Sequence, residues 1–476
     1  MSLPSISRKR RAAGIAVVCA TLLAACAGPR PAAPDTAGVE APAGWRDQPA
    51  GAASSDAPLV PSQWWRSFND PVLNALVDHA LEHNVDLAIA AARVQEARAT
   101  FRLSQAQRWP ELDAGGGVVR ERTVSAFGTP EIQTAKKIEL QVSYEFDLFG
   151  RLARASEAQR AALLATQASR ETIRLAVAAS VASGYLTLRA LDARLIVIRQ
   201  TVEARSESLR YARRRADSGY APQLDLRQAE AEYHAALQLV PATELSIRRQ
   251  EGALNVLLGD NPAPIARGLD LDALALVDAP AQLPSSVLRQ RPDIAQAEQQ
   301  LVATDRALDV ARANFLPRIS LSASGGFVDS TLLADPIRVF SLGGSVLVPL
   351  LDAGRLRAQA AAAAARRDQA AFAYRKAALG SFREVEDALA TVQRSREQEQ
   401  ELVLQSQALQ KALDLANGRY RSGYASYLEA LDAQRGVLSA DLSRLQSRSE
   451  RLSATVSLFQ SLGGGWDGET LGADSR

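Results

Sequence analysis

Residues 217–225 read Asp-Ser-Gly-Tyr-Ala-Pro-Gln-Leu-Asp, and residues 421–429 read Arg-Ser-Gly-Tyr-Ala-Ser-Tyr-Leu-Glu. The two stretches lie 204 positions apart, and the same offset pairs the Gly-Arg-Leu of residues 150–152 with that of residues 354–356. A fixed offset of this kind indicates an internal repeat. We therefore expect one structural unit of about 200 residues to occur twice in the chain.

The N-terminus has the pattern of an export signal. Residues 8–11 are basic, and residues 12–25 are mostly apolar but too short to cross a bilayer as a helix, which needs about 20 residues. Leu-Ala-Ala precedes Cys26, and this arrangement resembles the bacterial lipobox. The resemblance implies cleavage before Cys26 and acylation of its thiol, and Ala27 in the next position favours the outer membrane. An ordinary signal peptide with an incidental cysteine is the alternative.

The charge balance changes with the signal peptide. The full chain has a formal net charge of +2, and removal of residues 1–25 deletes four positive charges and no acidic residue, leaving −2. Such a balance gives no reason to expect nucleic acid as a partner. Cys19 is lost with the signal, so the mature chain keeps a single cysteine and cannot form an internal disulfide.

The sharpest local pattern predicts a β-strand. From Lys137 to Leu148, polar residues alternate with apolar ones, and twelve residues slightly exceed the length of a tilted transmembrane strand, about 9–11 residues. A weaker alternation runs from Ile319 to Phe327 in the second copy. Upstream of these strands the offset between copies is 207, because Trp-Pro at 109–110 matches Leu-Pro at 316–317. We expect the three-residue difference in the strand hairpin, where the length of an extracellular loop can vary freely.

The remaining pattern is helical. A helix is expected from Val72 to Arg108, and a very long one, with apolar residues every three or four positions, between Gly150 and Gly219. Ordered structure should begin near Trp64. The predicted division is a signal peptide 1–25, a lipid-anchored extended tether 26–61, a first repeat 62–262 (strands about 112–148, helical hairpin about 150–258), a linker 263–283, a second repeat 284–465 (strands about 318–350, helical hairpin about 354–462) and a flexible C-terminal tail 466–476.

Four amphipathic strands cannot cross a membrane alone. The smallest membrane barrels have eight strands, and an open sheet edge in lipid leaves main-chain groups without partners. Several copies must therefore pool their strands, and the sequence alone allows eight strands from two copies or twelve from three.

Five segments resemble one family: residues 64–71, 144–151, 291–294, 431–435 and 462–466. They resemble the TolC-type outer-membrane efflux factors, and most closely the OprM- or NodT-like lipoproteins, over about residues 60–470. The resemblance implies a mainly α fold with a membrane β-barrel, built from a duplicated helix-strand-strand-helix-helix unit. It also implies a homotrimer with a 12-stranded β-barrel and a long periplasmic α-helical barrel. The implied partners are a periplasmic membrane-fusion adaptor and an inner-membrane pump of the resistance-nodulation-division (RND) class.

The resemblance also assigns site residues. It places adaptor contacts at the hairpin tips, and it places the closed periplasmic gate at Leu428, Asp432 and Arg435. Without it, the glycines serve only the turns, and the Asp-Arg spacing of three is an ordinary pair on one helix face. The first repeat has Gln228 and Ala231 where the second has the charged pair, so we assign the gate to the second repeat. The tip residues are Ser218, Gly219, Tyr220, Ser422, Gly423 and Tyr424.

We expect a passive trimeric exit channel of a tripartite efflux pump, in the outer membrane, for drugs or other small toxic molecules. No catalytic motif is found, so no enzyme activity or cofactor is predicted. His79 and His83 are four residues apart, but the order of zinc proteases is absent, which favours a solvated helix face over a metal site. The alternatives are a duct for type I protein secretion or metal-ion export, and a periplasmic helical scaffold lipoprotein that does not span the membrane.

Overall fold

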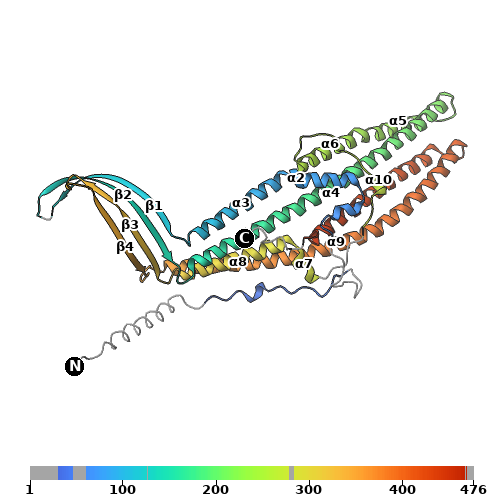
Figure 1. Ribbon diagram of the computed structural model, residues 1–476. Helices are drawn as coiled ribbons and strands as arrows, with labels where there is room; N and C mark the ends of the chain where they lie inside the picture. Colours follow the sequence, from blue (N-terminus) through green and yellow to red (C-terminus); the bar gives the residue numbers. More distant parts are fainter. Residues whose placement is uncertain (1–29, 47–59, 126, 278–283, 467, 469–476) are drawn as a thin grey trace. The chain divides into compact units, whose positions relative to one another are not determined.

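The computed structural model describes residues 30–46, 60–125, 127–277, 284–466 and 468. Its helices and strands follow the duplicated order expected from the sequence (Figure 1). The first copy comprises α2 (Pro71–His83), α3 (Val85–Ala106), β1 (Glu111–Val124), β2 (Pro130–Phe146), α4 (Arg151–Asp217), α5 (Gln223–Leu237) and α6 (Leu239–Leu258). The second comprises α7 (Pro284–Gln290), α8 (Pro292–Ala313), β3 (Arg318–Ser330), β4 (Ile337–Leu347), α9 (Arg355–Arg421) and α10 (Tyr427–Ser461). The 3-10 helices are η1 (Asp35–Ala37), η2 (Trp64–Phe68) and η3 (Leu271–Ala273).

The chain divides into two compact units, and each contains parts of both repeats. The first unit consists of Met1–Gly38, Arg93–Gln167 and Gln296–Lys376, and it carries all four strands. The second unit consists of Val39–Ala92, Ala168–Ala295 and Ala377–Arg476. The second unit holds both helical turns, because these lie near residues 219 and 423.

The four strands of the first unit form one antiparallel sheet in the order β1-β2-β3-β4 (Figure 1). In two neighbouring rows, its register aligns side chains of one kind across all four strands. One row consists of Asp113, Gln141, Ser324 and Ser341, and the next row consists of Leu112, Val142, Ala323 and Leu342. Successive residues of a strand point to opposite faces, so the sheet has a polar face and an apolar face in these rows.

The copies differ in the length of the strand hairpin, as expected, but the extra residues of the first copy do not lie in its loop. The loop has five residues in the first copy (125–129) and six in the second (331–336). The strands themselves differ: β1 and β2 have 14 and 17 residues, whereas β3 and β4 have 13 and 11. The first hairpin is therefore longer because its ladder continues to the pair formed by Val124 and Pro130.

Each strand pair leads into its long helix through the same joint. In the first copy, Asp147 accepts hydrogen bonds from the backbone N–H groups of Leu152 and Ala153, at 3.1 and 2.8 Å. In the second copy, Asp352 accepts from Leu356 N–H at 2.8 Å. A carboxylate at this place satisfies free N–H groups of the first helical turn and complements the helix dipole. The preceding glycines, at 150 and 354, have φ of 73° and 84°, which non-glycine residues rarely adopt.

Two helices predicted as continuous are interrupted. Asn84 ends α2 and caps α3, because its side-chain oxygen accepts from the N–H groups of Asp86 and Leu87 at 2.9 and 3.1 Å. The returning helix of the first repeat breaks at Gln238, between α5 and α6. Pro241 explains the break, since proline cannot donate a hydrogen bond to the carbonyl of Leu237. The second repeat has leucine at the matching position 445, and α10 is continuous there.

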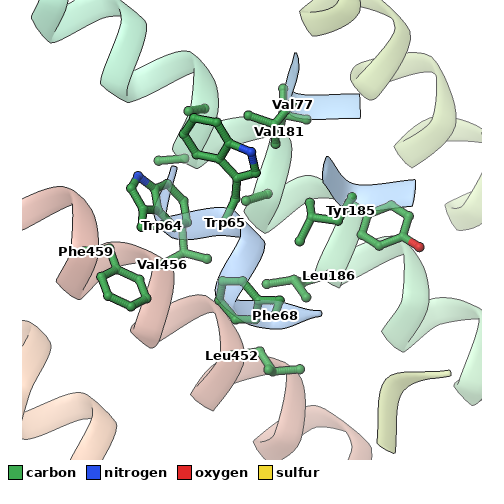
Figure 2. Close-up of a cluster of buried hydrophobic side chains, with 14 of the residues drawn as sticks. Trp64, Trp65, Phe68, Val77, Val181, Tyr185, Leu186, Leu452, Val456 and Phe459 are labelled. Atoms are coloured by element: carbon green, nitrogen blue, oxygen red, sulfur yellow. The ribbon is translucent and has the colours of Figure 1, made fainter. Parts of the chain in front are cut away.

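The core of the second unit is built around Trp64, Trp65 and Phe68 of η2 (Figure 2). The Trp64 ring stacks on Phe459 of α10 with centroids 5.5 Å apart, and it meets Trp65 edge-on. Next to this cluster, Asp70 caps α2 through Val72 N–H at 2.8 Å and accepts from the Tyr185 hydroxyl at 2.8 Å. These contacts explain why an aromatic-rich segment precedes the first helix: it fastens α2 to α4 and α10.

Ordered structure begins before Trp64, so that expectation is wrong. Trp45 is buried and packs edge-on against Phe382 of α9. Arg46 N–H donates to Glu386 at 3.1 Å. Residues 30–36 contact the first unit, as described below. The tether boundary at residue 61 stays a prediction, and the signal peptide 1–25, Cys26 and most of the tail 466–476 lie outside the described residues.

Candidate functional site

The two hairpin tips of the second unit have the same turn. Gly219 and Gly423 have φ of 76° and 78°, and the next residues, Tyr220 and Tyr424, donate their N–H groups to the carbonyls of Arg215 and Arg419, both at 2.9 Å. A left-handed glycine followed by this hydrogen bond is a Schellman helix ending. A Cβ at either glycine would meet nothing within 4 Å. Glycine is therefore required by the positive φ of the backbone and not by lack of space.

Both tip tyrosines project into solvent. Tyr220 and Tyr424 are 81% and 82% exposed. Ser218 is bonded locally, because its hydroxyl donates to the carbonyl of Arg214 at 2.7 Å. The predicted tip residues therefore form two equivalent hydrogen-bonded turns, each presenting one aromatic side chain.

The predicted gate residues lie on one side of α10 but bond differently from the expectation. Leu428 and Asp432 are exposed. Arg435 does not rely on Asp432: its Nε donates to Glu232 of α5 at 3.1 Å, and its Nη2 bonds the same carboxylate. This hydrogen bond raises the pKa of Arg435. The charged pair on one helix face is thus supplemented by an acidic residue of the other repeat.

Glu232 has a second arginine partner. Arg205 of α4 lies 2.9 Å from its other carboxylate oxygen and also donates to its main-chain carbonyl at 2.8 Å. The side chains of Arg205 and Glu232 are 6% and 11% exposed, against 55% for Arg435. Burial lowers the pKa of the Arg205 guanidinium, and the Glu232 carboxylate opposes this effect. One carboxylate therefore bridges a buried arginine of its own hairpin and an exposed arginine of the other hairpin.

Glu232 was not predicted as a site residue, although its position in the first repeat indicates a charged partner. Glu232 lies on the buried face of α5 together with Leu226, Ala229 and Ala236. A carboxylate in an apolar stripe requires a charged partner, so its position predicts one. The second repeat has Gly436 in this place, and Leu409 where the first has Arg205. A Cβ added to Gly436 would lie 3.2 Å from Leu409 Cδ2, so the second repeat uses close apolar packing where the first uses an ion pair.

An aromatic cluster joins the hairpins beside the tips. Tyr420 and Tyr427 pack with Ala212 and Ala229 of the first repeat. Burial raises the pKa of Tyr427 to about 12. Gln434 adds a polar link, because its amide donates to Ser208 at 3.2 Å. The two hairpins therefore contact each other through Tyr420, Tyr427, Gln434 and the Glu232 bridge.

The histidine pair forms no metal site in the described part of the chain. His79 stacks on His83 with ring centroids 4.3 Å apart, and its Nε2 lies 3.0 Å from Asp260. Across the described ranges, no three His, Cys, Asp or Glu side chains gather in a way that could hold a metal ion. Among the helices that the structure describes, none combines the length and the apolar character needed to cross a membrane.

The model of the outer membrane efflux protein family matches residues 76–260 and 283–464. The chain belongs to the outer membrane efflux protein family. Its relatives include ArpC of Pseudomonas putida, an antibiotic efflux pump outer membrane protein, which is 34% identical over 459 residues that cover 93% of this chain and 94% of ArpC. SilC of Salmonella typhimurium, a probable outer membrane lipoprotein, is 30% identical over 407 residues, 85% of this chain and 88% of SilC.

Solved structures agree with this membership. The outer-membrane channel OprN superposes with a TM-score of 0.84 and 30% identity, covering 92% of this chain and 99% of OprN. The TolC-type resemblance and the duplicated fold predicted from sequence are therefore confirmed. As an outer membrane efflux protein, the chain is a component of an efflux system located in the outer membrane.

Proposed function

We propose that the protein is the trimeric exit duct of a tripartite pump, through which small toxic molecules pass passively from the periplasm to the exterior. The sheet carries this proposal: the rows that contain Gln141 and Val142 are polar on one face and apolar on the other, and in one chain the outer edges of β1 and β4 have no strand partner within the described residues. In lipid such edges need partners. Three copies would join them into twelve strands, with the polar face around water and the apolar face toward lipid.

The names of two related proteins support efflux of small toxic molecules through a channel. ArpC is named for antibiotic efflux, and OprN is named as a channel. We expect the purified protein to conduct ions in planar bilayers, and we expect deletion of its gene to sensitise cells to antibiotics. A protein that forms no conducting unit in bilayers would overturn the duct, and unchanged susceptibility across antibiotic classes would overturn the substrate class.

The gate is assigned to Leu428, Asp432 and Arg435. Its support is the exposure of Leu428 on α10, one turn from the tip, and the bond from Arg435 that holds α10 to α5 at Glu232. Three symmetry-related leucines would narrow the aperture. Leu428→Ala should raise single-channel conductance, whereas Leu224→Ala, the same change at the matching position of the first repeat, should not. Equal effects of the two variants would contradict an assignment to the second repeat.

The hairpin tips are assigned to the adaptor, and the pump behind it is expected to be of the RND class. Support comes from two equivalent hydrogen-bonded turns with exposed tyrosines, Tyr220 and Tyr424. Replacing both tyrosines by Asp should abolish antibiotic resistance while leaving the conductance of the purified channel unchanged. Lost conductance, or retained resistance, would count against docking at the tips.

Acylation of Cys26 is the remaining part of the proposal. It rests on the lipobox-like sequence and on SilC, a relative named as a lipoprotein. Mass spectrometry of the N-terminal peptide would detect the acyl chains on Cys26. An unmodified cysteine in membrane-extracted protein would contradict this proposal without affecting the duct.

A further inference from the structure

Residues 30–36, here called the N-terminal strap, are held against α8 and α9 within the first unit by three arginines. The strap's own Arg30 makes two bonds of 2.7 Å to the carboxylate oxygens of Asp305, and its Nε lies 3.3 Å from Asp309. Both aspartates belong to α8. Both contacts to Asp305 come from Nη2, and Nε faces Asp309, so the guanidinium lies between the two carboxylates. The start of the strap is therefore fixed at one place on α8.

Arginines of α9 hold the rest of the strap by its main chain. Arg367, whose side chain is only 4% exposed, donates to the carbonyls of Pro31 and Ala32, both at 2.7 Å. Arg375 donates to the carbonyl of Thr36. Apart from these two carbonyls, Arg367 bonds only to the neighbouring Asp368 among the described residues. A buried guanidinium needs its donors satisfied. The strap therefore covers Arg367 and accepts from guanidinium N–H groups that Asp368 leaves without a partner.

The strap has a defined direction relative to the strands. α9 begins at Arg355, shortly after β4, so Arg367 lies nearer the strands along this helix than Arg375 does. The two arginines are eight residues apart, about 12 Å along the helix. Arg367 holds residues 31–32 and Arg375 holds Thr36, so the N-terminal end of the strap points toward the strands. Arg30 agrees, because Asp309 is nine residues before Arg318, where β3 begins.

Cys26 precedes Arg30 by four residues, which span at most about 14 Å of chain. We propose that the strap is a depth gauge: by docking on Asp305, Asp309 and Arg367, it holds the acylated N-terminus at a fixed level beside the β3–β4 hairpin. The acyl chains lie in the membrane leaflet, so the strap sets the level at which the strands enter the bilayer. This inference rests on the acylation proposed above and adds a recognition site for the N-terminal segment.

The docking can be measured in the full-length membrane protein with a spin label. In Ala33→Cys, the label reports strap mobility, because Cys26 is the other mature cysteine and its thiol would be acylated. We expect an immobilised spectrum. Asp305→Asn with Asp309→Asn should raise the mobile fraction roughly fivefold, the equilibrium effect of losing about one exposed ion pair. Glu401→Gln, an exposed change on α9 that lies 26 residues beyond Arg375, is the matched control. A mobile strap in the parent protein would overturn the docking.

The gauge can be measured by the recovery of heat-resistant oligomer from outer membranes. Eight Gly-Ser residues inserted between Ala27 and Arg30 add up to about 28 Å of reach and should lower recovery as much as Asp305→Asn with Asp309→Asn does. Arg30→Asp should lower it too, and Asp305→Arg with Asp309→Arg should restore it by reversing the pair. Unchanged recovery after the insertion would overturn the gauge while leaving the docking intact. An unacylated Cys26, found by mass spectrometry, would overturn the gauge together with the acylation, and the spin label would still report the docking.

Discussion

The two helical hairpins have the same tips but different interiors. Their turns match in φ and in hydrogen bonding, whereas about four helical turns away the first repeat buries Arg205 against Glu232 and the second packs Leu409 on Gly436. The difference shows which part of the repeat is fixed by backbone geometry and which part is free to change. The turn requires glycine in both copies, whereas the interior can be filled either by an ion pair or by apolar packing. The ion pair of the first repeat also links the hairpins, because the Glu232 carboxylate accepts a hydrogen bond from Arg435 of the second repeat.

The largest effect is expected from breaking the charged interior. Glu232→Ala leaves Arg205 buried without its counterion, and such a loss destabilises by about 3–5 kcal/mol. The thermal unfolding of the purified protein, followed by helical circular dichroism in detergent, should shift clearly downward. Glu230→Ala, which removes an acidic residue paired with Arg213 and Arg227 at the surface, is the control and should shift it far less. Similar shifts for both variants would show that the bridge is not buried in solution.

A smaller and equal effect is expected at the two turns. Gly219→Ala and Gly423→Ala each place a side chain at positive φ, which costs about 1–2 kcal/mol. Open space surrounds both positions, so no crowding adds to this cost. The same unfolding measurement should give matching shifts for the two variants. Unequal shifts would indicate that the tips differ in a way that the shared hydrogen-bond pattern does not reveal.

The gate pair should alter conductance more than stability. Asp432→Ala with Arg435→Ala removes an exposed ion pair partner from Glu232, worth about 0–1 kcal/mol, because Arg205 still neutralises the carboxylate. Single-channel conductance in planar bilayers should rise as α10 loses its bond to α5. Gln228→Ala is the control, since Gln228 occupies the matching place in the first repeat, where position 231 is already alanine. Unchanged conductance of the double variant would argue against the gate.

The smallest effect is expected from copying one repeat into the other. Arg205→Leu with Glu232→Gly gives the first hairpin the interior of the second, and replacing a buried ion pair by apolar packing is often neutral for stability. The unfolding midpoint should stay near that of the parent, unlike that of Glu232→Ala alone. Conductance should nevertheless rise, because Arg435 has lost its partner. A strongly destabilised double variant would show that the two interiors are not interchangeable.

Much of the fold was predictable because its periods are strong. The alternation from Lys137 to Leu148 and the helical period after Gly150 both correspond to observed elements, β2 and α4. The breaks were harder to predict: Asn84 and Pro241 interrupt helices whose apolar period continues through them. Single residues with capping or main-chain effects decide such boundaries, and a periodicity averaged over many residues does not register them.

The site was only partly predictable for a different reason. Leu428, Asp432 and Arg435 were assigned from the second repeat alone, whereas the partner of Arg435 lies 203 residues away in the first. A comparison of the two repeats finds positions that carry the same residue, but Glu232 aligns with a glycine. A contact between the repeats is invisible to an alignment of one repeat on the other. The buried face of α5 contained the only local hint, a carboxylate among apolar residues.

The shared carboxylate of Glu232 has a mechanical consequence. Its inner bond to Arg205 is shielded and stays within one hairpin, while its outer bond to Arg435 faces water and joins two hairpins. If the hairpins separate, Glu232 loses its outer bond but keeps its inner one, so no buried charge is left without a counterion. Opening the contact between Glu232 and Arg435 therefore costs only the modest energy of a surface ion pair. The acceptor remains held in position by Arg205, ready for Arg435 to engage it again when the hairpins return.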